Sequence, residues 1–378
     1  MKSEDILKAI GNIDEKYISQ ADKEKGTVMR LVKPLAVIAA CVCLVAGGIG
    51  AYRHFSYKNL PQLGSYNIVF DSMGFDGTNS YSLKNSDDIN PWNGQTKIRT
   101  LPVYKNLCYS GGSLTQSHYS AQELETMANQ VAEFFGETVI STQITTADDD
   151  ENQIYALIAQ TESLQISVNG RGASVIFKSE QFSDEKTVGL FSELEKNAES
   201  FDSTGYVSGN AATISDSGEW LGNKLIAYKL GKNTVENIVN FNLRPVEVSF
   251  SKDGNVYSVH FEDYTSCSEK LGDYPIISAD DAKAMLLNGK YLTSVDEENL
   301  ISCGKVTEKL IEKVDLVYYT TGNPELYMPY YRFFVRLDLL EQRTESVDAD
   351  FESYGYFYVP AVNEKCFENY ELFDGSFQ

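Results

Sequence analysis

Alternating hydrophobic and polar positions predict most of the regular structure along this chain. Hydrophobic residues at every second position indicate strands, because successive side chains of a strand point to opposite faces. The predicted strands cover residues 66–70, 97–104, 139–145, 154–160, 164–168, 173–178, 224–230, 245–251, 256–261, 306–319, 327–337 and 354–362. Asn169-Gly170 and Asp253-Gly254 are typical of two-residue hairpin turns between neighbouring strands.

Three helices are predicted after residue 96 from apolar residues that recur at spacings of three and four. The first begins at Ser120 and ends near residue 135, and Ser120 with Glu123 forms a capping box that fixes its start. The second covers residues 184–200. The third is capped by Ser278 and Asp281 and stops at Gly289, a residue that suits a helix C-terminus.

The order of these elements indicates an α+β fold, because helices are mixed irregularly with antiparallel hairpins rather than arranged in βαβ units. A polar stretch over residues 54–96 predicts a stalk or irregular lead. A second stretch, rich in Ser, Gly and Asn, predicts a linker over residues 202–222. These boundaries divide the body into two α+β lobes, residues 97–201 and residues 223–378.

An uncharged apolar segment, LAVIAACVCLVAGGIGAY, begins at Leu35 and ends at Tyr52. A helix of this length nearly crosses a hydrocarbon core of roughly 30 Å, so we predict a transmembrane helix over residues 34–53. Basic residues are denser before the segment than after it, which predicts a cytoplasmic N-terminus and an extracytoplasmic body. Two alternatives stay open: lipidation of Cys41 in the lipoprotein-like sequence IAAC, and cleavage of a signal peptide to give a secreted protein.

The predicted cytoplasmic tail, residues 1–33, has an amphipathic pattern near its start. Its apolar positions fall on one face of a helix: Ile6, Leu7, Ile10, Ile13, Tyr17 and Ile18. Such a short helix is marginal in water unless its apolar face contacts a partner. Because acids and bases are balanced on the polar face, we favour docking of a cytosolic protein over adsorption to anionic lipid headgroups.

The charge of the chain excludes one class of partner for the body. The formal net charge is -22, while residues 1–52 carry seven Lys and Arg against six Asp and Glu, so the negative charge lies in the remainder. An acidic body repels nucleic acid, and it is consistent with solubility or attraction to cationic partners. High aromatic content, with 24 Tyr and 19 Phe, indicates a chain that can bury a sizeable core.

The cysteines and histidines form no recognised metal or catalytic motif. No catalytic residue, metal or cofactor is therefore predicted, and we do not expect an enzyme. A thiol dyad of Cys108 and His118 is an alternative to the favoured interpretation, a buried cysteine and a loop histidine. The acidic run over residues 148–151 is interpreted as a solvated turn rather than a calcium site, since it lacks the spaced ligands of one.

Disulfide pairing after the apolar segment is not determined by the sequence. The cysteines concerned are Cys108, Cys267, Cys303 and Cys366. None of them belongs to a C-x-x-C pair, and zero, one or two disulfides are compatible with their spacing. We expect them to be unpaired and buried, because a body of this size does not need covalent stabilisation.

Aromatic residues are densest near the C-terminus, in the strands predicted over residues 327–337 and 354–362. Tyr330 and Tyr356 in these strands are candidates for a ligand face, because tyrosine both stacks and donates hydrogen bonds. Alternating aromatic residues in paired strands more often pack within a sheet. Core packing is therefore the favoured interpretation.

Several segments resemble known membrane-associated proteins. ILKAIGNIDEKYISQA, followed by a basic patch and LAVIAACVCLVAGG, resembles the starts of clostridial membrane-anchored proteins, some of which are similar to anti-sigma factors. TLPVYKN, GDYPIISADDAKAMLLNGKYLTSV, VDLVYY, MPYYRFFVRL and YGYFYVPAV resemble extracytoplasmic proteins of gut Firmicutes. The helix in ISADDAKAMLLNGKYL, with the strands after it, is also similar to PepSY-type modules.

These resemblances imply a single-pass, membrane-anchored sensory or regulatory protein with an extracytoplasmic body. Its implied partners are a cytosolic sigma factor or other regulator on the tail and a ligand in the envelope. The alternative is a cell-surface or lipoprotein-type binding module that does not signal. An enzymatic activity is not implied by the resemblance.

Overall fold

The computed structural model describes residues 60–64, 78–80, 88–109, 117–146, 153–178, 206–214, 220–251, 256–293, 295, 305–320, 324–336 and 353–369. All of them belong to the compact unit Leu60–Gln378. The predicted tail, the predicted transmembrane helix, the strand over residues 66–70 and the helix over residues 184–200 lie outside these residues. Among the described residues, no helix is both long enough and apolar enough to cross a membrane.

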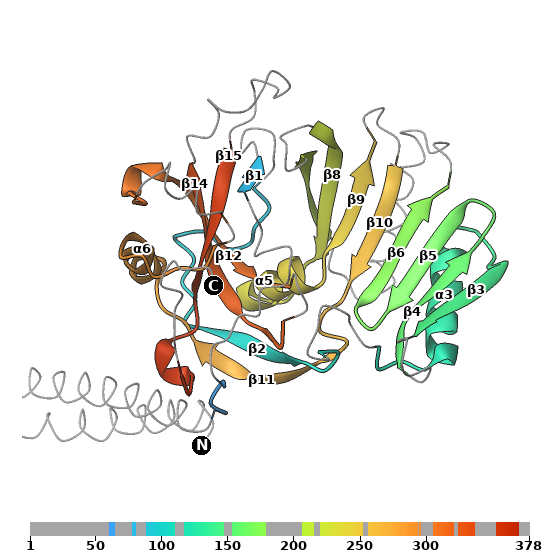
Figure 1. Cartoon of the computed structure of the whole chain (residues 1–378), viewed down its shortest axis with the longest axis horizontal. Coiled ribbons are helices and arrows are strands. Elements are labelled where there is room, and N and C mark those ends of the chain that lie inside the picture. Colours follow the sequence, from blue (N-terminus) through green and yellow to red (C-terminus); the bar gives the residue numbers. More distant parts are fainter. Residues whose placement is uncertain are drawn as a thin grey trace, which may run out of the picture. The chain divides into compact units, whose positions relative to one another are not determined.

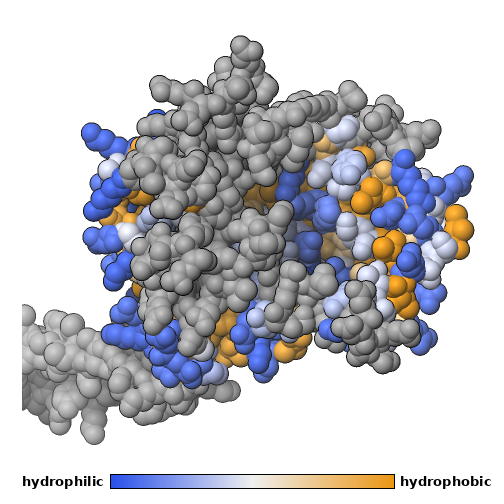
Figure 2. Space-filling model, in the orientation of Figure 1, coloured by the Kyte–Doolittle hydropathy of each residue, from blue (hydrophilic) through white to orange (hydrophobic). Residues whose placement is uncertain are grey.

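The largest element of the fold is an eight-stranded antiparallel sheet, in the order β3-β4-β5-β6-β10-β9-β8-β7 (Figure 1). Its strands are β3 (Ser141–Thr146), β4 (Ile154–Gln160), β5 (Leu164–Asn169), β6 (Gly172–Phe177), β7 (Tyr206–Ile214), β8 (Trp220–Lys229), β9 (Val246–Phe250) and β10 (Val256–Glu262). Figure 2 shows hydrophobic residues scattered among hydrophilic ones over the β3–β6 end. We call this element the large sheet.

Two smaller antiparallel sheets complete the strand structure of the described residues. The first, called the aromatic sheet, has the order β1-β15-β14-β12, and the second has the order β11-β2-β13. The strands of the aromatic sheet are β1 (Thr78–Ser80), β12 (Ile311–Tyr318), β14 (Pro329–Arg336) and β15 (Ser353–Pro360). Those of the second are β2 (Thr100–Asn106), β11 (Ser268–Pro275) and β13 (Leu326–Tyr327).

Three α-helices accompany these sheets within the described residues: α3 (Ala121–Phe134), α5 (Thr234–Leu243) and α6 (Ala279–Leu287). Two 3-10 turns cover Glu308–Leu310 and Glu364–Cys366. The predicted capping boxes of α3 and α6 are both present, and Gly289 takes a positive φ of 78° just after α6. Antiparallel sheets with a few helices confirm the predicted α+β class.

The predicted division into two lobes at residues 202–222 is not what the strand pairing shows. β6 comes from the first predicted lobe and β10 from the second, yet they pair along five registered positions. β2, from the first lobe, likewise pairs with β11 and β13. The predicted linker is replaced by β7 and the start of β8, which form an antiparallel hairpin at the edge of the large sheet. One sheet therefore crosses the predicted boundary.

The predicted stalk over residues 54–96 is wrong where the structure describes it. Leu63 is buried, its N–H donates to the Cys366 carbonyl, and it forms a parallel bridge with Phe367. The Tyr274 hydroxyl donates to the Pro61 carbonyl at 2.7 Å. Trp92 is also buried, in the core beside α6. These apolar residues are too few to form a periodic pattern, which explains why the surrounding polar composition misled the prediction.

In the part of the chain that the structure describes, three hydrophobic clusters form the core, and two of them cover the aromatic sheet. α3 packs on one face of the large sheet through Leu124, Ala128 and Ala132. One face of the aromatic sheet packs with α5 and α6. Its other face forms a cluster that contains Tyr330, Phe334 and Tyr354. The aromatic sheet is thus buried on both faces, and this is why its strands carry large side chains at consecutive positions.

Candidate functional site

A cleft of about 460 Å³ lies between the polar face of the large sheet and the aromatic sheet. β8, β9 and β10 form one wall, and β12, β14 and β15 with the residues just after β12 form the other. Figure 1 shows β8 next to the aromatic sheet. The volume is in the range of small-molecule sites, which are usually concave and mostly apolar with a few polar groups.

Strand register assembles the polar wall of the cleft. Glu247 on β9 lies directly across from Ile226 on β8 and from His260 on β10. Lys224 and Glu262 lie two residues away from Ile226 and His260 along their strands, so they share the same face. The intervening valines of β9 and β10 point to the opposite face, into the core beneath α3. Alternation in the sequence thus separates a buried face from a face with ionisable groups.

Two ionisable groups of this wall, Glu262 and His260, have shifted pKa values. The pKa of Glu262 is raised from 4.5 to about 7, mainly by burial and also by Glu247, while Arg171 opposes the shift. Burial lowers the pKa of His260 below 6.5. Lys224 Nζ lies 2.5 Å from a carboxylate oxygen of Glu247, so these two charges offset each other. Because its folded pKa exceeds the unfolded value, Glu262 contributes stability that is present below pH 4.5 and is lost as the pH rises from 4.5 through about 7.

Aromatic rings and one arginine form the opposite wall. The Arg332 guanidinium carbon lies 5.1 Å from the ring centroids of both Phe334 and Tyr356. Its Nη2 is 3.3 Å from a carboxylate oxygen of the buried Asp315. Arg332 pairs in register with Asp315 on β12 and with Tyr358 on β15, so its position is set by both neighbouring strands. This wall offers the π faces and hydroxyl groups of tyrosine without an uncompensated positive charge.

The two candidate ligand-face tyrosines lie in different positions. Tyr356 lines the cleft, whereas Tyr330 is not among its lining residues. Both belong to one hydrophobic cluster, with 8% and 4% of their surface exposed for Tyr356 and Tyr330. The favoured interpretation as packing residues is confirmed, and a role in ligand binding stays a prediction.

The polar wall was missed by sequence reasoning. Glu247, His260 and Glu262 belong to two strands that were predicted correctly, and polar residues at alternating positions of a strand are usually solvent-facing. The signal that could have suggested the cleft is the occurrence of ionisable residues at alternating positions in one group of strands and of tyrosines in another group, far away in the sequence. Only the pairing of β9 with β10 and the nearby aromatic sheet bring these faces together.

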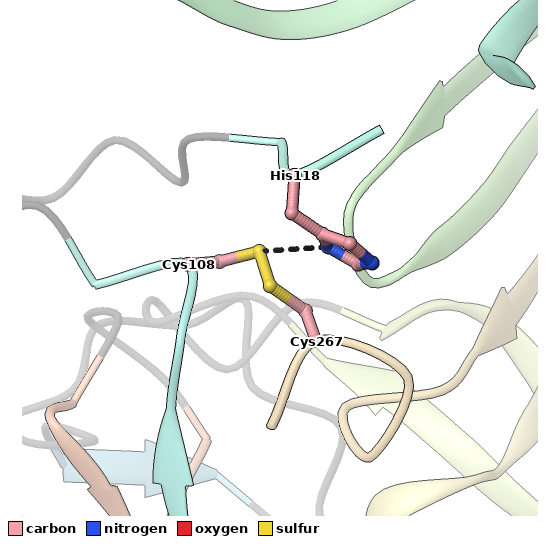
Figure 3. A group of neighbouring side chains, drawn as sticks. All are labelled: Cys108, His118 and Cys267. Carbon is pink, nitrogen blue, oxygen red and sulfur yellow. Dashed lines mark hydrogen bonds between the residues drawn. A yellow bond between two sulfur atoms is a disulfide. The ribbon is translucent and has the colours of Figure 1, made fainter. Parts of the chain in front are cut away.

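A second group of reactive side chains consists of Cys108, Cys267 and His118 (Figure 3). Cys108 and Cys267 form a disulfide, so the expectation that both would be unpaired is wrong. Cys366 is free and buried as expected, and Cys303 lies outside the described residues. His118 Nδ1 lies 3.7 Å from Cys108 Sγ, which places the two residues of the alternative thiol dyad side by side. The sequence offered no reason to add Cys267, because that residue is 159 positions from Cys108.

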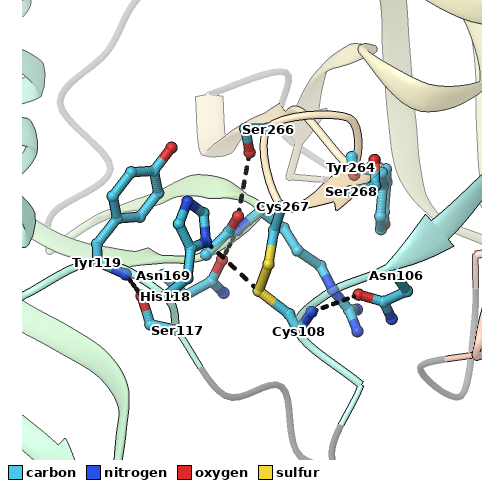
Figure 4. Close-up of a disulfide and its surroundings, with 12 residues drawn as sticks. Asn106, Cys108, Ser117, His118, Tyr119, Asn169, Tyr264, Ser266, Cys267 and Ser268 are labelled. Atoms are coloured by element: carbon cyan, nitrogen blue, oxygen red, sulfur yellow. Dashed lines mark hydrogen bonds between the residues drawn. A yellow bond between two sulfur atoms is a disulfide. The ribbon is translucent and has the colours of Figure 1, made fainter. Parts of the chain in front are cut away.

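Backbone hydrogen bonds hold the two cysteines in place (Figure 4). Cys108 N–H donates to Asn106 Oδ1, and Leu107 N–H donates to the Cys267 carbonyl. The turn before Cys267 is held by the Asp263 carboxylate, which accepts from the N–H groups of Thr265 and Ser266. Each cysteine is thus fixed by contacts that do not involve its sulfur.

The histidine comes from a separate segment, just before α3. Ser117 N–H donates to the Ile154 carbonyl on β4, and Tyr119 N–H donates to Ser117 Oγ. These bonds position His118 between them, with its ring 3.9 Å from the Tyr119 ring centroid. His118 is exposed, whereas both cysteines are only 1% exposed.

The cleft and the cysteine–histidine group contain residues from several elements far apart along the chain. The acidic run over residues 148–151 and the apolar tail positions, the other sites considered from the sequence, lie outside the described residues. Neither a scan against protein-family models nor searches of curated proteins and solved structures find a match for this chain.

Proposed function

We propose that the chain is a single-pass, membrane-anchored sensory protein whose extracytoplasmic body binds a small organic cation in the cleft. The observation that carries the ligand class is the pairing of a half-buried carboxyl, Glu262, with a wall of tyrosines across the same cleft. The anchor and the signalling role rest on the apolar segment, the amphipathic tail and the resemblance described above.

The balance of charge in the cleft favours a cationic ligand. Lys224 is offset by Glu247 and Arg332 by Asp315, while Arg171 does not prevent the pKa of Glu262 from rising to about 7. A ligand ammonium near Glu262 would favour its ionised form, and the facing tyrosine rings attract cations through their π faces. The net charge of -22 also raises the local concentration of cations.

Replacing Glu262 with glutamine is expected to weaken binding of choline, used as the probe cation, at least tenfold at pH 8, which is ~1.4 kcal/mol. For the unmodified chain, affinity should fall by about tenfold between pH 8 and pH 6, because a carboxyl with a pKa of about 7 becomes protonated over that range. E262Q should show no such pH dependence. Isothermal titration calorimetry of the full-length chain at both pH values measures each affinity.

The matched control is Glu269→Gln, the same substitution at an exposed position of β11 outside the cleft lining. It should bind choline like the unmodified chain at both pH values. Equal affinities for E262Q and E269Q at pH 8 would contradict a role for Glu262. Failure of the unmodified chain to bind choline or any other organic cation would contradict the ligand class.

Replacing Ile10 and Ile13 together with aspartate is expected to abolish capture of a cytosolic regulator by the full-length chain. Both residues belong to the apolar face predicted for the tail, and two carboxylates there would prevent its burial against a partner. Affinity purification from the native membrane, followed by mass spectrometry, compares the proteins retained. Ser19→Asp, on the opposite face, is the control and should retain the regulator. Retention of the same proteins by all three chains would contradict a docking role for the apolar face.

A further inference from the structure

We propose that Cys108, Cys267 and His118 bind a Zn²⁺ ion when their disulfide is reduced. Their ligand atoms, two sulfurs and one imidazole nitrogen, all lie within 4.8 Å of one another. Thiolate and imidazole are the ligands that Zn²⁺ prefers in proteins. The inference concerns a second site and is independent of the function proposed for the cleft.

The distances of the oxidised group are already near those of a zinc site. Tetrahedral Zn²⁺ with Zn–S of about 2.3 Å and Zn–N of about 2.0 Å separates a sulfur and a nitrogen ligand by roughly 3.6 Å. His118 Nδ1 and Cys108 Sγ are 3.7 Å apart. The Cys267 sulfur already lies within 4.8 Å of the imidazole nitrogen, and the two sulfurs must separate to roughly 3.8 Å. Their Cα atoms are 5.9 Å apart, so rotation about the Cα–Cβ bonds supplies this change without moving the backbone.

The surrounding contacts keep the three ligands together after reduction. The Leu107–Cys267 and Cys108–Asn106 hydrogen bonds involve backbone groups and do not depend on the S–S bond. The Ser117–Ile154 hydrogen bond holds the segment that carries His118, and it also does not depend on the disulfide. A preorganised ligand set lowers the free energy needed to order the site on metal binding.

Access and coordination number both favour a labile site. His118 is exposed, so one ligand of the site contacts solvent while the two sulfurs are buried. Three protein ligands leave the fourth tetrahedral position to water, as in sites that exchange a ligand. The metal is therefore expected to bind reversibly rather than as a closed structural ion.

Reduction of the disulfide and binding of the metal are two separate steps, and electrons and protons balance in each. A dithiol reductant transfers two electrons and two protons to the disulfide, which yields two cysteine thiols and the oxidised reductant. Zn²⁺ then displaces one proton from each thiol, and two protons are released per metal bound. The disulfide and the metal complex use the same two sulfurs, so they exclude each other. Metal occupancy thus reports the redox state of the surroundings.

The test uses Co²⁺ as a spectroscopic substitute for Zn²⁺ on the full-length chain. The chain is reduced with a phosphine, desalted without oxygen and titrated with Co²⁺ beside an oxidised sample. The reduced chain should bind one additional Co²⁺, with tetrahedral d–d bands and a thiolate-to-cobalt charge-transfer band that disappear when Zn²⁺ is added. The oxidised chain should lack these bands, because its sulfurs are joined to each other.

Two variants assign the ligands. His118→Ala keeps both thiols and should weaken Co²⁺ binding at least tenfold with an altered d–d spectrum. Cys366→Ser, at the free buried cysteine, should leave the titration unchanged. The proposal is overturned if the reduced chain shows no bands, or if H118A matches the unmodified chain. It is also overturned if reduction removes the far-UV circular dichroism signal and Co²⁺ does not restore it.

Discussion

The double variant Cys108→Ser/Cys267→Ser is expected to lose about 5 kcal/mol of unfolding free energy. The disulfide joins residues 159 positions apart, and the chain-entropy model gives about this value for a loop of that length. The link connects a residue just beyond β2 to the residue just before β11, so it ties together the ends of two paired strands of one sheet. Urea denaturation followed by far-UV circular dichroism measures the change.

The reduced, unmodified chain provides the matched comparison for this prediction. In the absence of added metal it should unfold at nearly the same urea concentration as the double serine variant, because both lack the crosslink. If the oxidised chain and the double variant unfolded at the same urea concentration, the crosslink would not stabilise the fold.

Gly172→Ala is expected to destabilise the fold by ~3 kcal/mol or more. Gly172 has a φ of 151°, a conformation that side chains with a Cβ rarely adopt, and such strain costs about 1–3 kcal/mol. A Cβ atom there would also lie against the carbonyl oxygen of Phe261, well inside contact distance. Both effects act where β6 pairs with β10, at the centre of the large sheet. Thermal unfolding should show a melting temperature lower by roughly 6 °C or more.

Gly64→Ala is the control for the glycine substitution. A Cβ at this position meets no atom within 4 Å, so its melting temperature should stay near that of the unmodified chain. If G172A and G64A had the same melting temperature, the close approach of β6 to β10 at Gly172 would be contradicted. The prediction therefore tests the pairing that joins the two halves of the sequence into one sheet.

Helices and strands that are determined by residues close together in the sequence were predicted from local patterns. The bounds of β4 were predicted without error, since Ile154–Gln160 is apolar and the adjacent strands alternate clearly. The α3 and α6 starts were predicted because Ser-x-x-acid capping boxes satisfy helix N–H groups by themselves. The β5–β6 hairpin was also predicted, although its turn is Gly170-Arg171, one residue later than expected.

Elements that depend on distant partners were missed. β11, with the sequence SEKLGDYP, has charges and a glycine that disfavour a strand, and its pairing with β2 holds it in place. α5 has three asparagines among its ten residues, and it relies on the Asn233 cap and on burial of Ile238 and Leu243. Neither feature gives a strong local signal, because tertiary packing overrides propensity there.

The candidate sites show the same limit. The sequence offered Cys108 with His118, ten residues apart, only as an alternative, and could not add Cys267. It offered Tyr356 as a ligand-face candidate but did not indicate the polar wall opposite, which comes from β8, β9 and β10. Residues from different segments become one site only through the strand order of the folded unit, and a single sequence does not specify that order.

The bridge between Leu63 and Phe367 has a mechanical consequence. Leu63 bridges Phe367 and exchanges hydrogen bonds with the segment that follows β15, the strand that carries Tyr356 and Tyr358. Tension on the polypeptide ahead of Leu63 would therefore reach β11, through the Tyr274–Pro61 hydrogen bond, and the segment after β15 before it reached the large sheet. Of the two walls of the cleft, the one that contains β15 would receive the force before the polar wall.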